Sequence, residues 1–247
     1  MSQVCIISGC SRGIGKAIAT TLAERGYALG LLARSEEVFL VQHLCEKSKD
    51  LCSLLMQTEK NMSLFIWHVS PLLSRSSVSK IVSELGKPVG LVNVAGINID
   101  SLAIRAKKSE LEALIETNIL GTVSMTQAVL PHMMKQRKGS IVTLGSIVGE
   151  GGRVGQSGYA MTKSALLGFS RSVAKEMGRF NVRSNVVEPG FIATDMTEKS
   201  VRDREELVKK ISLGRMGSVE EVANVVSFLL SDAASYITGS VRNSTVL

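Results

Sequence analysis

The chain has 247 residues, of which 45% are hydrophobic, and a formal net charge of +7 at pH 7. That length and composition are typical of one α/β domain, so we expect a single domain over residues 1–247. No apolar run approaches the ~20 residues of a membrane span. Aromatic residues make up only 4% of the chain, and no nucleic-acid motif interleaves the basic residues. We therefore expect neither a membrane span nor a nucleic-acid partner.

The cysteines and histidines follow no metal-ligand spacing and no disulfide framework. The four cysteines are Cys5, Cys10, Cys45 and Cys52. Free cysteines are typical of a reducing compartment, and we expect no metal. The first expected strand starts within a few residues of Met1, so organellar import is expected to use an uncleaved signal.

Short apolar runs alternate with amphipathic helical patterns, as they do in repeated βαβ units. The expected strands cover residues 4–7, 28–32, 64–67, 91–94, 140–144 and 183–187. Strands joined through helices run parallel and are covered on both faces. The pattern therefore predicts an α/β fold with a Rossmann-like, doubly wound parallel sheet and helices on both faces.

A glycine-rich loop follows the first expected strand and precedes a helical pattern from Lys16 to Arg25. Gly9, Gly13 and Gly15 permit a tight turn and a close approach to a pyrophosphate, and the helix N-terminus offers free N–H groups. The alternative is an ordinary glycine-rich turn. The position of the loop, between a strand and a helix, favours a dinucleotide site. The loop residues expected at the cofactor are Gly9, Ser11, Arg12, Gly13, Ile14 and Gly15.

The end of the second strand bears on the choice of cofactor. An acidic residue about 20 residues past the loop would bind the ribose 2′-hydroxyl of NAD. This chain instead has Ala33-Arg34-Ser35 there. Arg34 and Arg12 have the planar guanidinium that matches a phosphate, although either side chain could be merely exposed. Two arginines and no acid predict NADPH/NADP.

A serine, a tyrosine and a lysine form the expected catalytic group. Tyr159 and Lys163 lie four apart, so on a helix they share a face. A neighbouring cation lowers the pKa of a phenol toward the range of a general acid/base. Ser146 follows a buried strand, at the end where parallel sheets bind ligands. A bare Tyr-x-x-x-Lys is usually a solvated helix face, but its context here indicates an oxidoreductase.

The order of these motifs resembles that of the short-chain dehydrogenase/reductase family over nearly the whole chain. The shared residues are Gly9-x-x-x-Gly13-x-Gly15, Asn93-Val94-Ala95-Gly96, Asn118, Ser146, Tyr159 and Lys163. Within the family, Pro189-Gly190-Phe191 and Thr194-Asp195-Met196-Thr197 make the chain similar to 3-oxoacyl-[acyl-carrier-protein] reductases. The resemblance implies NADPH-dependent reduction of 3-oxoacyl thioesters in fatty acid biosynthesis, with side activity on quinones or other carbonyls.

The resemblance also implies a role for each site residue. Tyr159 donates a proton to the substrate oxygen and Ser146 hydrogen-bonds it. Lys163 lowers the pKa of the phenol and holds the ribose, while Asn118 holds a water that relays protons. Further cofactor contacts are implied for Asn93, Ala95, Gly96, Pro189, Gly190, Ile192 and Thr194. Gln156 is expected to line the substrate pocket; the alternative is a mobile loop side chain.

Three segments depart from the family pattern. His68-Val69 stands where the family has Asp-Val beside the adenine. Residues 36–62 are longer and less regular than expected and are interpreted as a helix and loop. After Gly239, the last strand is shortened and polar, and its loss would expose an edge of the sheet. These departures keep open a catalytically weak subunit of a hetero-oligomeric reductase. A dehydrogenase acting on steroids or other carbonyls is a third reading.

Basic residues concentrate between Met133 and Arg183, with nine basic residues against two acidic ones. Solvated helix faces are the ordinary explanation, but such charge also attracts acidic partners. The resemblance names acyl carrier protein or acyl-CoA as that partner. It also implies a homo- or hetero-tetramer with a related reductase, and the mitochondrial matrix as location, with the cytoplasm as the alternative.

Overall fold

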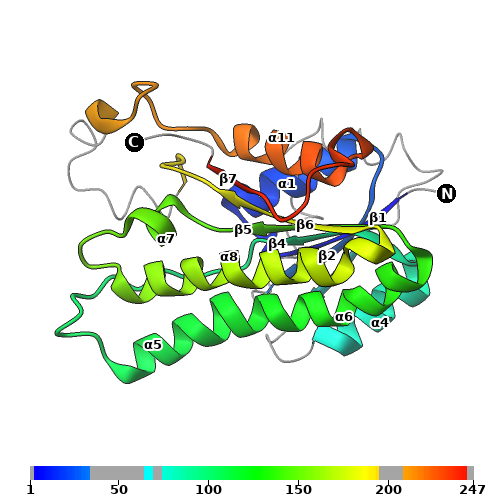
Figure 1. Cartoon of the computed structure of the whole chain (residues 1–247), viewed down its shortest axis with the longest axis horizontal. Helices are drawn as coiled ribbons and strands as arrows, with labels where there is room; N and C mark the ends of the chain where they lie inside the picture. The colour runs from blue at the N-terminus through cyan, green and yellow to red at the C-terminus, as the bar shows by residue number, and fades with distance from the viewer. Residues whose placement is uncertain (1–2, 34–63, 69–73, 195–207, 244–247) are drawn as a thin grey trace.

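The computed structural model describes residues 3–33, 64–68, 74–194 and 208–243 (Figure 1). In them, seven parallel strands form one sheet in the order β3-β2-β1-β4-β5-β6-β7. The strands are β1 (Val4–Ser8), β2 (Ala28–Ala33), β3 (Leu64–His68), β4 (Pro88–Asn93), β5 (Gly139–Leu144), β6 (Val182–Glu188) and β7 (Val241–Asn243). The expected strands are confirmed to within three residues at each end.

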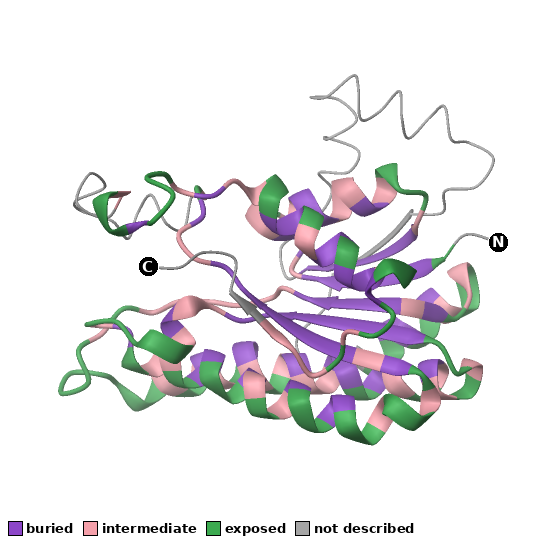
Figure 2. Ribbon diagram, turned by 45° about the horizontal axis from the view of Figure 1, so that its top comes forward, coloured by how far each residue is buried: buried purple, intermediate pink, exposed green. Residues whose placement is uncertain are grey.

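Helices cover both faces of this sheet. Helices α1 (Gly13–Glu24) and α11 (Val219–Leu230) pack on one face; α4 (Ser74–Leu85), α6 (Gly121–Gln136) and α8 (Ser157–Met177) cover the other (Figure 1). Each face has its own apolar core, which is why every residue of β1, β2 and β5 is buried (Figure 2). The doubly wound α/β fold predicted from the sequence is confirmed. None of the described helices is long and apolar enough to cross a membrane.

The chain changes direction across the sheet at β1, which pairs with β2 on one side and β4 on the other. In open α/β sheets, such a point is where ligands bind, at the carboxyl ends of the strands. Backbone bonds join the two loops: the amides of Val94 and Ala95 both donate to the carbonyl of Ser8, at 3.1 and 3.0 Å. This edge carries the predicted glycine loop.

The shortened last strand leaves less of the sheet edge open than the sequence suggested. β7 pairs with β6 over three residues, from Val186 to Glu188. Just before β7, two more backbone bonds extend the ladder: the amide of Gly239 donates to the carbonyl of Ser184, and the amide of Val186 in β6 donates to the carbonyl of Ser240. The strand is short, as predicted, but the edge of β6 is covered by residues 237–243.

Some predictions fall on residues outside those the structure describes. They are the helix and loop expected at residues 36–62, the cofactor residue Arg34, and Val69. His68 ends β3 and pairs with Ala33 of β2.

Candidate active site

The predicted catalytic residues converge at the carboxyl edge of the sheet from three separate elements. Ser146 follows β5 and caps the short helix α7 (Ile147–Gly151), with its hydroxyl accepting from the amide of Val148 at 3.3 Å. Tyr159 and Lys163 lie on the first turns of α8. Asn118 lies in the π-helix η3 (Ile115–Leu120), which follows α5 (Lys108–Leu114) and precedes α6. Single-turn π-helical segments are frequent at functional sites.

The hydroxyl groups of Ser146 and Tyr159 lie close enough to interact. Burial raises the pKa of Tyr159, and the interaction with Ser146 lowers it in part. A raised pKa keeps the phenol protonated at neutral pH. The pair therefore presents a proton donor and a second hydroxyl side by side.

Lys163 is buried behind this pair. Its ammonium donates to the carbonyl oxygen of Leu144 at 2.8 Å and lies 5.7 Å from the centre of the Tyr159 ring. Burial lowers the pKa of Lys163 to about 8. The expectation that a neighbouring lysine lowers the pKa of the phenol is not met here, because burial outweighs the other contributions to the pKa of Tyr159 and raises it.

Asn118 is fully buried and fixed by three hydrogen bonds. Its side-chain oxygen accepts from the amide of Ile97 at 2.8 Å, and its nitrogen donates to the Ile97 carbonyl and to the Thr162 hydroxyl, both at 3.0 Å. The Thr162 hydroxyl in turn donates to the carbonyl of Tyr159 at 2.8 Å. This chain of bonds links Asn118 to the turn of α8 that carries the tyrosine. The role of Asn118 in a proton relay stays a prediction.

The glycine loop forms a backbone cradle beside the catalytic group. Gly9 has φ +81°, and a Cβ there would lie 2.5 Å from the amide nitrogen of Ala95. A Cβ on Gly15 would overlap the carbonyl oxygen of Gly9. Gly13 has φ +53° and lies beside the methyl group of Thr194. Neighbouring backbone fills the place of a side chain at Gly9 and Gly15, so only glycine lets the loop turn this tightly, as a loop that holds a pyrophosphate on its backbone must.

The start of helix α1 is suited to an anion. Arg12 occupies the N-cap position without a side-chain capping bond, and the first turn of this described helix has no acidic residue. The N–H groups and the positive end of the helix dipole thus point into the cradle. Ser11 and the exposed Arg12 lie in the loop itself, and Ile14 lies in the first turn of α1.

The remaining predicted cofactor residues differ in what they offer. Asn93 is buried and donates to the hydroxyls of Thr126 and Thr143, so its side chain fastens β4 to α6 and β5. The side chain of Ile192 belongs to the core that α1 and α11 share, and its backbone forms an isolated parallel bridge with Gly217. Pro189 and Gly190 follow β6 and continue toward this segment, at the same edge of the sheet.

Gly96 lies where the cradle and the catalytic residues meet. A Cβ on Gly96 would lie 3.3 Å from the side-chain oxygen of Asn118 and 3.4 Å from the ammonium of Lys163. The polar ends of both residues therefore reach the backbone that follows β4. A group bound along this backbone lies within reach of Lys163.

Gln156 is buried rather than mobile, with 7% of its surface exposed. It lies at the N-cap position of α8, three residues before Tyr159, and its side-chain nitrogen donates to Asp100 at 2.7 Å. This contact shows how Gln156 is held but does not test its predicted role toward the substrate.

Sequence reasoning did not identify three contributors to this site. They are Thr162, the carbonyl of Leu144, and Asp100. Thr162 had a detectable signal, since a threonine three residues after Tyr159 shares its helix face. The carbonyl and the aspartate had none, because their contacts depend on how distant segments pack. Among the described residues, no three His, Cys, Asp or Glu side chains gather in a way that could hold a metal ion.

A glycine cradle at a helix N-terminus, beside a neighbouring serine and tyrosine and a buried lysine, defines a dinucleotide-dependent oxidoreductase. Residues 9–243 match the family model described as "Enoyl-(Acyl carrier protein) reductase". With the matching motifs, this shows that the chain belongs to the short-chain dehydrogenase/reductase family.

Two curated relatives and one solved structure illustrate the similarity. The chain is 40% identical to 3-oxoacyl-[acyl-carrier-protein] reductase FabG of Escherichia coli, over 96% of this chain and 93% of the relative. It is 41% identical to carbonyl reductase family member 4 of Xenopus laevis, over 98% and 95%. The solved structure "ElxO with NADP Bound" superposes with a TM-score of 0.85 at 27% identity, covering 98% of this chain and 97% of the other.

Proposed function

We propose that this protein uses NADPH to reduce 3-oxoacyl thioesters to 3-hydroxyacyl thioesters in fatty acid biosynthesis, with side activity on quinones or other carbonyls. The observation that carries the proposal is that Ser146 and Tyr159 meet in front of the buried Lys163, at the edge of the sheet that carries the glycine cradle. Relatives named as reductases of 3-oxoacyl-[acyl-carrier-protein] support the substrate class.

NADPH fits the cradle described above. The backbone at Gly9, Gly13 and Gly15 would hold the pyrophosphate, and Arg12 would face the 2′-phosphate, for which a guanidinium is suited. A neighbour whose structure is described as NADP-bound supports this choice. When bound, the reduced nicotinamide supplies a hydride to the carbonyl carbon of the substrate.

Tyr159 and Ser146 handle the charge that develops on the substrate oxygen. Tyr159 donates its phenolic proton to that oxygen, which becomes the hydroxyl of the product. Ser146 donates a hydrogen bond to the same oxygen and so stabilises the negative charge as it forms. The raised pKa of Tyr159 keeps the proton in place until it is needed.

Lys163 stabilises the phenolate that remains on Tyr159. Its ammonium faces the ring at 5.7 Å, inside a buried environment where charges interact more strongly than in water. With a pKa near 8, Lys163 also gains and loses its own proton close to working pH. It can therefore return a proton to Tyr159 between turnovers.

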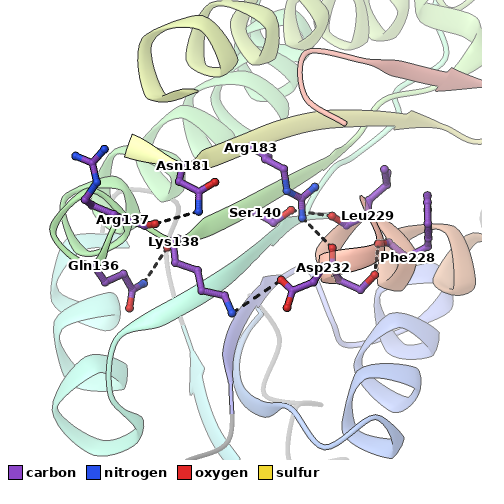
Figure 3. Close-up of polar contacts among 10 residues, drawn as sticks. Gln136, Arg137, Lys138, Ser140, Asn181, Arg183, Phe228, Leu229 and Asp232 are labelled. Carbon is purple, nitrogen blue, oxygen red and sulfur yellow. Dashed lines mark hydrogen bonds and ion pairs between the residues drawn. The ribbon is translucent and has the colours of Figure 1, made fainter. Parts of the chain in front are cut away.

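The acidic carrier is proposed to meet a basic cluster at the opposite edge of the sheet. Arg137 and Arg179 both lie over the ring of Phe180, at 6.0 and 4.7 Å. Lys138 is 3.9 Å from Asp232, and Figure 3 shows this region with Arg137 and Arg183. The rise of an α-helix places Tyr159 and Arg179 about 30 Å apart. A carrier docked at the basic cluster therefore delivers its acyl chain along the surface or to the site of another subunit.

Not all of the basic segment contributes to that cluster. Lys163 is buried, and the guanidinium of Arg183 donates to the carbonyls of Ser231 and Ile237. Acyl carrier protein is the preferred partner in this proposal, and acyl-CoA is the alternative.

A tetramer and a mitochondrial location complete the proposal. Both come from the resemblance to 3-oxoacyl-[acyl-carrier-protein] reductases. The measurements are light scattering of the purified protein and imaging of the tagged full-length chain against matrix and cytoplasmic markers. A monomer, or a cytoplasmic signal alone, would refute the respective part.

The decisive experiment follows NADPH oxidation by the purified protein with an acetoacetyl thioester, with NADH as the alternative donor. Tyr159→Phe removes only the phenolic hydroxyl and is expected to lower kcat about a thousandfold. Tyr236→Phe is the matched control, because Tyr236 is fully exposed and away from the site. Equal activity in Tyr159→Phe and wild type would refute the mechanism. No turnover by folded, NADPH-binding wild type would favour the silent subunit, and strict steroid preference would favour the third reading.

A further inference from the structure

A short strap, residues 97–101, touches both sides of the candidate active site. At its start, the backbone of Ile97 exchanges two hydrogen bonds with the side chain of Asn118. At its end, Asp100 and Ser101 contact the loop that precedes α8. The strap thus joins the π-helix that carries Asn118 to the loop before the helix that carries Tyr159.

Asp100 makes the side-chain contacts of this strap. Its Oδ1 accepts from the side-chain nitrogen of Gln156 at 2.7 Å and from that of Asn98 at 2.8 Å. A hydrogen bond to a carboxylate is shorter and stronger than one between neutral groups. Asn98 fixes the carboxylate from within the strap, so the carboxylate holds Gln156 in one position.

The backbone next to Asp100 adds a second tie. The amide of Ser101 donates to the carbonyl of Gly155 at 2.7 Å, and Ser101 forms an isolated parallel bridge with Gln156. Gly155 has φ +78°, a conformation that favours glycine. Two adjacent residues of the strap therefore hold two adjacent residues of the loop.

Gln156 passes this restraint on to α8. Its carbonyl accepts from the amide of Ala160 at 2.8 Å, so Gln156 belongs to the first turn of the helix. Tyr159 lies in the same turn. A displacement of Gln156 changes both the side chain proposed to line the substrate pocket and the start of the helix that presents the phenol.

We infer that Asp100 is a positioning residue that acts through Gln156 to fix the substrate side of the site. This inference deepens the proposed function and rests on it. Asp100 is exposed, and its side chain bonds to Asn98 and Gln156 rather than to a catalytic residue, so its effect passes through Gln156 and the loop. The same oxygen of Asp100 accepts both side-chain hydrogen bonds, so a substitution that removes this oxygen removes both bonds.

Substitution of Asp100 by asparagine or by alanine separates the effect of the hydrogen-bonding oxygen from the effect of the negative charge. Asp100→Asn keeps an oxygen that can accept both bonds and is expected to keep kcat/KM within about twofold of wild type. Asp100→Ala removes it and is expected to lower kcat/KM for the acetoacetyl thioester about tenfold, mainly by raising KM. Glu112→Ala is the control for the lost charge, because Glu112 makes only an exposed ion pair with Lys108.

A double-mutant cycle tests whether Asp100 acts through Gln156. Asp100→Ala is expected to have little further effect on KM once Gln156→Ala is present, because the partner is already gone. Full additivity of the two substitutions would overturn the inference. So would a loss in Asp100→Asn as large as that in Asp100→Ala.

Hydrogen exchange gives a readout that does not depend on activity. Asp100→Ala is expected to speed exchange of the Ala160 amide about tenfold, while Asp100→Asn and Glu112→Ala leave it unchanged. Unchanged exchange in Asp100→Ala would overturn the inference even in an active enzyme. If wild type reduces no thioester but exchange responds as expected, the proposed function fails and the positioning by Asp100 stands.

Discussion

The glycine cradle and the catalytic cluster lie side by side but are built in opposite ways. The cradle works because Gly9, Gly13 and Gly15 lack side chains, so its backbone can turn and pack more tightly than other residues allow. The cluster works because Asn118, Thr162 and Lys163 bury polar groups and satisfy them with hydrogen bonds. Added atoms therefore damage the first region, and removed atoms damage the second. Substitutions in each region should separate cofactor affinity from turnover.

The largest effect is expected from Lys163→Met in the cluster. We expect kcat to fall about a thousandfold, because the phenolate of Tyr159 loses its cation. We also expect the folded protein to become more stable at pH 7. Lowering the pKa of Lys163 from 10.5 to about 8 corresponds to a cost of about 3 kcal/mol for the charged form. The unpaired carbonyl of Leu144 offsets about 1–2 kcal/mol of that gain.

The pH dependence of this stability difference has a definite sign. Below pH 8, Lys163 is protonated in both the folded and unfolded chains, and the full burial cost applies. As pH rises from 8 to 10.5, the folded chain loses its proton first, so wild-type stability increases relative to Lys163→Met. Chemical denaturation of both proteins across this range measures the difference. A constant difference between pH 7 and pH 10.5 would contradict the lowered pKa.

In the cradle, Gly15→Ala should act on cofactor affinity. The added Cβ would overlap the carbonyl of Gly9 and lie 3.1 Å from the Cα of Cys10, so backbone must shift. We expect the Kd for NADPH to rise about a hundredfold, which corresponds to ~2.7 kcal/mol. Fluorescence titration measures the affinity. Gly178→Ala is the control, since no atom lies within 4 Å of a Cβ there; equal affinities in the two variants would refute the cradle.

Much of the cradle and of the catalytic cluster could be predicted from the sequence, because these features depend on local patterns. The strand, glycine loop and helix at residues 4–24 are contiguous, and Tyr159 and Lys163 are one helical turn apart. Such short-range relations follow from backbone geometry alone. The family order of motifs placed Ser146 and Asn118 as well, and the structure brings Ser146 to Tyr159.

The features that the sequence did not predict depend on contacts between segments that are distant in the chain. Asp100 meets Gln156 across 56 residues of chain, and no periodicity joins them. The pKa of Tyr159 was expected to fall because Lys163 is near, but its burial by surrounding elements has the larger effect. Arg183 was counted in a basic surface, yet its guanidinium is committed to two carbonyls beyond α11. Charge and burial are properties of the fold and cannot be read from neighbouring residues.

A smaller effect, restricted to turnover, is expected from Thr162→Val. Valine keeps the shape but removes the hydroxyl that accepts from Asn118 and donates to the carbonyl of Tyr159. We expect kcat to fall about tenfold and stability by ~1–2 kcal/mol, with the Kd for NADPH unchanged. Ser170→Ala is the matched control on α8, because it loses a buried hydroxyl contact with Ser184 away from the site. An equal loss of kcat in both variants would mean that Thr162 matters only for stability.

The smallest effect is expected at Gly96, where cradle and cluster meet. A Cβ there lies 3.3 Å from the oxygen of Asn118, which three hydrogen bonds hold, and 3.4 Å from the ammonium of Lys163. The lysine tip can yield more readily, because it ends a long side chain with one bond to Leu144. Gly96→Ala should therefore lower kcat about threefold, equivalent to ~0.7 kcal/mol, through a displaced ammonium.

The quantity that changes in Gly96→Ala shows whether Gly96 serves the cradle or the catalytic cluster. A displaced Lys163 ammonium leaves its bond to the Leu144 carbonyl, so the pH profile of kcat should shift along with its magnitude. Gly151→Ala is the control, because open space surrounds that position. A rise in the Kd for NADPH with kcat and its pH profile unchanged would place Gly96 in the cradle alone. A shifted pH profile of kcat with an unchanged Kd for NADPH would show that the position of the Lys163 ammonium requires a glycine at position 96.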